Sequence, residues 1–166
     1  MADPNIHSPQ WDAELDAPFD LRAQRAGAHA GAQELGATLY EIAPGGAISP
    51  YHAHHGNEEL LVVLSGTPQL RTPGGVRELV PGAVVAFPRG PQGAHRVANA
   101  SGEPARVLLV STMNHPDIAE HIDTGAVLAM TGAEAGWVFP GGTDRPVWDM
   151  VVEGMKAAGD HGEDES

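Results

Sequence analysis

Two spaced motifs constrain this chain more than any other feature of its sequence. The first places two histidines and a glutamate between two glycines, as Gly46-x5-His52-x-His54-x4-Glu59-x6-Gly66. Glycine at such positions allows the sharp turns that join short strands. On an extended strand, His52 and His54 lie on one face, about 7 Å apart along the chain. The motif therefore predicts β-strands that carry imidazole and carboxylate groups.

A second motif adds a third imidazole in a similar setting. It reads Gly82-x5-Pro88-x-Gly90-x4-His95-x3-Asn99. Three imidazoles with one carboxylate suit first-row divalent metal ions. The chain has no cysteine, which excludes thiolate ligands and disulfide bonds. Together the two motifs indicate a metal site of nitrogen and oxygen ligands in a β-barrel pocket.

Short apolar runs between turn residues predict an all-β fold. Seven or eight such runs lie between residues 35 and 112, which is typical of a sandwich or barrel. Helical signal is confined to one turn at Pro116–His121 and a short C-terminal segment, Val147–Ala157. The expected strands are Leu35–Ala43, a strand through His52 and His54, Glu58–Leu64, Gln69–Thr72, Val76–Val80, Ala83–Phe87, His95–Ala98 and Ala105–Ser111.

The length of 166 residues fits one domain with a single core. We expect four parts along the chain. An irregular N-terminal arm spans residues 1–33, and the barrel spans 34–113. A C-terminal extension, 114–158, is expected to pack on the barrel, and a disordered acidic tail covers 159–166.

The charge of the chain limits its partners. With 22 acidic and 9 basic residues, the formal net charge is −13, which argues against nucleic acid and anionic membranes as partners. No run approaches the roughly 20 apolar residues of a membrane span, and no N-terminal stretch resembles a signal peptide. We therefore expect a cytoplasmic protein whose partner is a small molecule.

The two motifs resemble those of the cupin superfamily, and locally those of small bacterial single-domain cupins. The first cupin motif, G-x5-H-x-H-x3/4-E-x6-G, is matched at every fixed position. The second, G-x5-P-x-G-x2-H-x3-N, is matched except that four residues, not two, separate Gly90 from His95. The resemblance covers residues 35–112. It implies a double-stranded β-helix, or jelly-roll barrel, and a homodimer.

The resemblance also implies four metal ligands, namely His52, His54, Glu59 and His95. They would hold one divalent transition metal: iron, manganese, nickel, copper or zinc. Glu58 is a competing carboxylate because its spacing from His54 is also allowed, but the spacing to the closing glycine favours Glu59. The remaining histidines are expected to lie away from the metal; they are His7, His29, His55, His115, His121 and His161.

Three functions remain open from the sequence. The first is a dioxygenase-like enzyme acting on a small organic molecule. The second is a Lewis-acid isomerase, epimerase or lyase acting on a sugar or small acid. The third is a non-catalytic module that binds a small ligand or a metal. The only lysine, Lys156, lies outside the predicted barrel, which lowers support for a phosphosugar site that depends on a barrel lysine.

Overall fold

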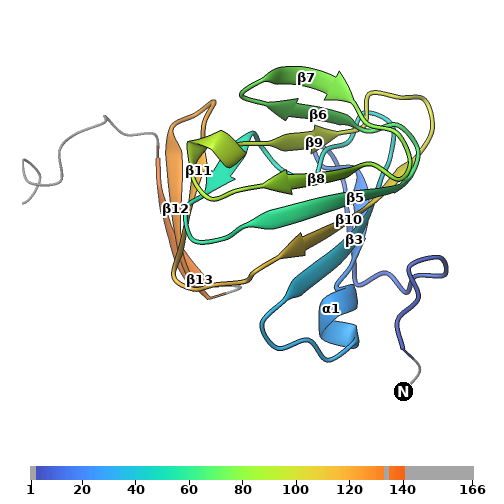
Figure 1. Ribbon diagram of the computed structural model, residues 1–166, viewed down its shortest axis with the longest axis horizontal. Coiled ribbons are helices and arrows are strands. Elements are labelled where there is room, and N and C mark those ends of the chain that lie inside the picture. Colours follow the sequence, from blue (N-terminus) through green and yellow to red (C-terminus); the bar gives the residue numbers. More distant parts are fainter. Residues whose placement is uncertain (1–2, 133–134, 141–166) are drawn as a thin grey trace, which may run out of the picture.

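Strands make up almost all of the regular structure of this protein (Figure 1). The computed structural model describes residues 3–132 and 135–140. The expected helix at Val147–Ala157 and the acidic tail fall outside these residues. Among those that are described, no helix has the length and hydrophobicity that crossing a membrane requires.

A six-stranded antiparallel sheet forms one wall of the barrel. Its three central strands, β3, β10 and β5, are seven residues long. Along β5 the side chains alternate between buried and exposed positions, as expected when one face of a sheet packs on a core. The strands in spatial order are β1 (Ala13–Leu15), β2 (Leu21–Gln24), β3 (Gly36–Ile42), β10 (Ala105–Ser111), β5 (Glu59–Ser65) and β8 (Val84–Phe87).

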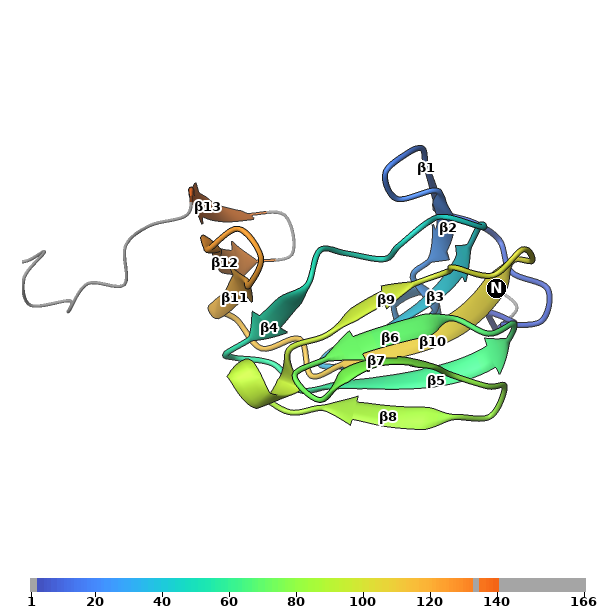
Figure 2. The same cartoon turned by 90° about the horizontal axis from the view of Figure 1, so that it is seen from above.

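Two smaller sheets complete the fold. One contains, in spatial order, β7 (Gly75–Glu78), β6 (Gln69–Thr72) and β9 (Arg96–Ala98). The other contains β13 (Ala135–Phe139), β12 (Ala126–Gly132), β11 (Asp117–His121) and β4 (His52–His54), and Figure 2 shows β11–β13 at one end of the barrel. Two turns of helix, α1 (Ala26–His29) and η1 (Pro91–Gly93), lie in connections.

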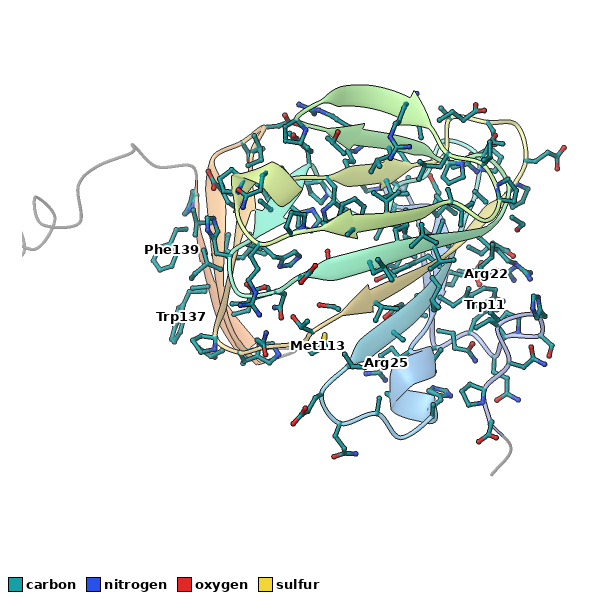
Figure 3. All side chains as sticks on the ribbon, viewed as in Figure 1. Trp11, Arg22, Arg25, Met113, Trp137 and Phe139 are labelled. Atoms are coloured by element: carbon teal, nitrogen blue, oxygen red, sulfur yellow. The ribbon has the colours of Figure 1, made fainter. Side chains whose placement is uncertain are left out.

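The core lies between the six-stranded sheet and the three-stranded sheet of β7, β6 and β9. Its buried side chains come from both walls, which explains why the strands alternate apolar and polar residues. Outside the core, Trp137 and Phe139 on β13 are 63% and 55% exposed and project away from the barrel (Figure 3). The core residues are Ile42, Leu61, Val63, Leu70, Leu79, Phe87, Val97 and Val107.

All the strands expected between residues 35 and 112 are present, so the all-β prediction is confirmed. The helical turn predicted at Pro116–His121 is wrong, because residues 117–121 form β11, paired with β4 on one side and β12 on the other. Asp117 and Ala119 are buried while Ile118 is exposed, which is the period of a strand. The N-terminal arm also contains two short strands, β1 and β2, that the sequence analysis did not predict.

Replacing Leu61 with alanine is expected to destabilise the protein by about 2–5 kcal/mol, because the substitution leaves a cavity in a fully buried position. Leu60 is the matched control, since it precedes Leu61 on β5 but is 39% exposed. Leu60→Ala should cost less than about 1 kcal/mol. Urea denaturation of both variants tests this, and equal losses would contradict the assignment of the core face.

Candidate metal centre

Four side chains from two motifs converge at the end of the barrel near β4. His52 and His54 lie on β4, Glu59 begins β5, and His95 directly precedes β9. The backbones of His52 and His95 pair with each other: the His52 N–H donates to the His95 carbonyl at 3.1 Å, and the His95 N–H donates to the His52 carbonyl at 2.8 Å. This pairing holds the two motifs side by side.

The reactive atoms of the four residues lie within a few ångströms of one another. The Nε2 atoms of His52 and His54 are 3.0 Å apart. Oε2 of Glu59 lies 3.2 Å from Nε2 of His95 and 3.8 Å from Nε2 of His54. His52, Glu59 and His95 are buried, and His54 is half-buried. The structure thus brings together all four residues that the motifs singled out.

Each of the three histidines uses Nδ1 for a contact that turns its Nε2 toward the cluster. Carbonyl and carboxylate oxygens only accept hydrogen bonds, so the Nδ1 atom that meets one carries the proton. A ring that carries its proton on Nδ1 alone keeps the Nε2 lone pair free for a metal. The contacts join Nδ1 of His52 to the Pro50 carbonyl at 2.9 Å, Nδ1 of His54 to Oδ2 of Asp117 at 2.6 Å, and Nδ1 of His95 to the Gly93 carbonyl at 3.0 Å.

Glu59 supplies an oxygen that lacks a protein partner. Its Oε2 atom is buried and has no hydrogen-bond partner, although Nε2 of His95 lies 3.2 Å away. A buried carboxylate oxygen without a partner is costly. Burial opposes ionisation of Glu59, but contact with His95 and positive charge on the neighbouring histidines hold its pKa below the usual value. The carboxylate therefore favours positive charge at this point.

The surroundings of His52 disfavour its positively charged form. Burial, followed by the positive charge of His95, lowers the pKa of His52 from 6.5 to about 4. The imidazole is therefore neutral near pH 7, as a metal ligand must be. A neutral imidazole at His52 beside the carboxylate of Glu59 fits a divalent cation.

The loop that is two residues longer in the second motif contains η1, and it keeps His95 in place. Gly90 has φ of +84°, which favours glycine. A Cβ on Gly93 would lie 1.7 Å from the Pro88 carbonyl oxygen, so only glycine allows this close approach. On its other side, the His95 ring stacks on Phe87, with ring centroids 3.7 Å apart. The longer loop therefore still directs His95 to the cluster.

The alternative carboxylate and the remaining histidines are not part of the four-residue cluster. Glu58 is exposed, whereas Glu59 is buried and belongs to the cluster. His55 is also exposed, with Nε2 3.4 Å from a Glu120 oxygen. His115 is exposed, and it lines a cavity that His54 also lines. His121 is also closer than expected, its ring centroid lying 6.3 Å from that of His52. His7 is exposed, His29 contacts Asp12, and His161 lies outside the described residues.

Two cavities flank the cluster. One, of about 220 Å³, lies toward β3, β10, β11 and β12, and the other, of about 190 Å³, lies toward β9. Tyr40, His54, Glu59 and Leu109 line both, so the cavities meet at the cluster. The larger one is completed by Gly36, Thr38, Asn57, Ser111, Met113, His115, Asp117, Met130 and Gly132.

Sequence reasoning missed two residues of this site. The sequence predicts only a strand around Tyr40 and a helical turn at Asp117. The sequence from Asp117 to His121, Asp-Ile-Ala-Glu-His, has no apolar–polar alternation that would indicate a strand, and Pro116 before it is typical of the start of a helix. No motif in the sequence links Asp117 to His54, which precedes it by 63 residues.

Stability of the metal-free protein should fall as the pH decreases from 6.5 to about 4. In this range the unfolded chain protonates His52 while the folded protein resists protonation, so the unfolded state binds more protons. The loss attributable to His52 is at most about 3 kcal/mol. Urea denaturation at pH 7.5 and 4.5 with chelator measures it, and His52→Gln should reduce the difference. An unchanged difference in His52→Gln would contradict the assignment.

Comparison with known proteins identifies the family. The cupin domain model matches residues 38–111. The structure is similar to a protein from Acidithiobacillus ferrooxidans proposed to be a sugar phosphate isomerase, with 25% identity, TM-score 0.69 and coverage of 76% of this chain and 80% of that one. It is also similar to a sugar phosphate isomerase of the cupin superfamily from Silicibacter pomeroyi, with 24% identity, TM-score 0.72 and coverage of 84% and 92%.

A third similar structure has a different named activity. It is a polyketide cyclase from Streptomyces resistomycificus, with 25% identity, TM-score 0.56 and coverage of 70% of this chain and 82% of that one. A comparison with curated proteins found no match. One fold thus carries unlike activities among these relatives, so fold alone does not assign a reaction. From the domain match, the paired motifs and the strand order of the barrel, residues 38–111 of this chain form a domain of the cupin superfamily.

Proposed function

We propose that His52, His54, Glu59 and His95 bind one divalent transition metal ion, and that the protein uses it in an enzymatic reaction on a small organic molecule. The observation that carries this proposal is the orientation of the donors. Three imidazoles hold Nδ1 to oxygen acceptors and present Nε2 to a buried carboxylate oxygen without a hydrogen bond. A divalent cation would satisfy all four atoms.

The donor set leaves several metals open. Imidazole and carboxylate suit iron, manganese, nickel, copper and zinc, and four protein ligands leave one or two positions for water or substrate. When bound, such an ion would polarise a substrate oxygen and, if redox-active, would support chemistry with dioxygen. The partly buried setting limits water around the reacting groups and strengthens electrostatic contacts.

Dioxygen-dependent chemistry on an uncharged substrate is the reaction class that we favour. The larger cavity carries an apolar surface from Leu109, Met113 and Met130, with hydroxyl groups from Thr38 and Ser111. Of the ionisable side chains in the same lining, His54 and Glu59 belong to the cluster and Asp117 contacts His54. The apolar and hydroxyl-bearing part of the cavity suits an organic molecule with a few polar groups. Fixed hydroxyls would orient such a molecule beside His54 and Glu59.

Tyr40 lies where the two cavities meet and would contact a bound molecule. Burial, and then the negative charge of Glu59, raises the pKa of the Tyr40 phenol. The phenol therefore keeps its proton at neutral pH and can donate a hydrogen bond to a substrate oxygen. In this role Tyr40 would hold the substrate and keep a proton available at the phenol oxygen.

A Lewis-acid isomerase is the second candidate. Two similar solved proteins carry sugar phosphate isomerase in their names, one of them as a proposal. The same donor set would support this chemistry, since a metal can polarise the carbonyl and hydroxyl groups of a sugar. An isomerase would keep its activity without dioxygen, whereas an oxygenase would lose it, and a binding module would convert nothing.

Protein purified without added metal should contain about one equivalent of a transition metal by elemental analysis. His52→Ala and His95→Ala should each lower metal affinity by about 100-fold or more, since loss of a direct ligand costs at least as much as loss of its supporting contact. His55→Ala is the matched control and should keep wild-type metal content. Stoichiometric metal in both ligand variants would contradict the proposed site.

An oxygen electrode separates the two enzymatic proposals. With a panel of neutral aromatic and hydroxylated molecules, the metal-loaded protein should consume dioxygen, and His95→Ala should not. The same panel and a set of sugar phosphates should be incubated without dioxygen. Anaerobic conversion of a sugar phosphate, with no oxygen uptake on any compound, would replace the oxygenase proposal with the isomerase.

A further inference from the structure

We propose that Asp117 is a positioning residue of the metal centre: its carboxylate fixes the tautomer and direction of His54. The inference rests on the proposed metal site. Asp117 is the first residue of β11 and lies outside the region that matches the cupin domain, which ends at residue 111. The role of Asp117 would therefore make the β4–β11–β12 sheet part of the site.

The carboxylate of Asp117 is fully occupied by contacts to the segment that carries His54. Its side chain is 0% exposed, and Oδ2 lies 2.6 Å from Nδ1 of His54. The second oxygen, Oδ1, accepts a hydrogen bond from the Gly56 N–H at 2.7 Å. One buried carboxylate thus holds both the ring of His54 and the backbone two residues beyond it.

The surrounding chain is shaped for this contact. A Cβ on Gly56 would lie 2.8 Å from Oδ1 of Asp117 and 3.1 Å from the Pro116 carbonyl oxygen, so glycine allows the close approach. Asn57 ties the same segment to Asn114: its side chain donates to the Asn114 carbonyl at 3.1 Å and accepts from the Asn114 N–H at 2.5 Å. Contacts of Gly56 with Asp117, and of Asn57 with Asn114, therefore hold the two chain segments in the positions that bring Asp117 to His54.

His54 differs from the other two histidines in its support. His52 and His95 donate Nδ1–H to neutral carbonyls two residues away in their own segments. The acceptor of His54 is charged and comes from another strand. A hydrogen bond to a carboxylate is stronger than one to a carbonyl, and it makes the opposite ring nitrogen a better donor to a metal. His54 should therefore be the strongest nitrogen ligand of the three.

Asparagine at position 117 would keep the shape of the side chain but not its function. The two oxygens of Asp117 each accept a hydrogen bond, from His54 and from Gly56. An amide has one oxygen and one donor group. If its oxygen stays on Gly56, its NH₂ faces Nδ1 of His54 and favours the tautomer with the proton on Nε2. That tautomer offers no lone pair to the cluster.

Two measurements on full-length protein test the inference. Long-range ¹H–¹⁵N spectra of the metal-free protein report which ring nitrogen of His54 carries the proton. Wild type should show the proton on Nδ1, and Asp117→Asn should move it wholly or partly to Nε2. Competition with a chelator, using Co(II) alone as the probe, should show affinity about 10–100-fold lower in Asp117→Asn.

Asn114→Ala is the matched control. Its side chain donates to the Gly56 carbonyl at 3.1 Å, so the variant loosens the same segment without touching His54. It should keep the wild-type tautomer and Co(II) affinity within about threefold, well inside the loss expected for an outer contact. Equal affinity losses in Asn114→Ala and Asp117→Asn would overturn the inference, because they would indicate a structural effect alone.

The two proposals fail in different ways. A wild-type spectrum with the His54 proton on Nε2 would overturn the positioning role whether or not metal binds, and it would decide even if Asp117→Asn does not fold. Reduced affinity in Asp117→Asn with an unchanged tautomer would also overturn that role. A wild-type protein with the proton on Nδ1 that binds no Co(II) would instead overturn the proposed metal site, and with it the place of Asp117 in that site.

Discussion

The reciprocal backbone hydrogen bonds between His52 and His95 are the contact on which the rest of the site depends. They join two motifs that lie far apart in the sequence, and they link β4 to the chain that enters β9. Without them, the imidazoles would belong to separate surfaces of the barrel. With them, Glu59 needs only to begin β5 at the same end for four donors to meet. Folding therefore places the four donors close together before any ligand binds, so binding does not have to supply the free energy that gathers them.

The barrel and its four clustered residues could be predicted because their signals are local. Glycines mark the turns, and the spacing to Gly66 separates Glu59 from Glu58. The structure agrees, because Glu59 lies on the same buried face of β5 as Leu61 and Val63. The four-stranded sheet, β13-β12-β11-β4, could not be predicted in the same way. Its strand β11 takes its place from pairing with β4 and β12, and pairing with distant partners leaves little trace in a short sequence.

Asp117 illustrates what motif reasoning leaves out. The motifs contain the atoms that face the cluster, but they do not contain what orients those atoms. For His52 and His95 the orienting carbonyls lie two residues away, inside the motifs. For His54 the orienting group is Asp117 on β11. This residue lies beyond residues 38–111, the part of the chain that matches the cupin domain. Differences among cupins in such supporting residues offer a physical route to different reactions on one fold.

A crystal structure of the protein with its native metal, located by anomalous scattering at the absorption edge, tests the central claim most directly. The account predicts one ion bonded to Nε2 of His52, His54 and His95 and to a carboxylate oxygen of Glu59, at about 2.0–2.2 Å for an ion such as zinc. An ion bonded through Nδ1 of these histidines, or a metal bound elsewhere with this cluster left free, would contradict it.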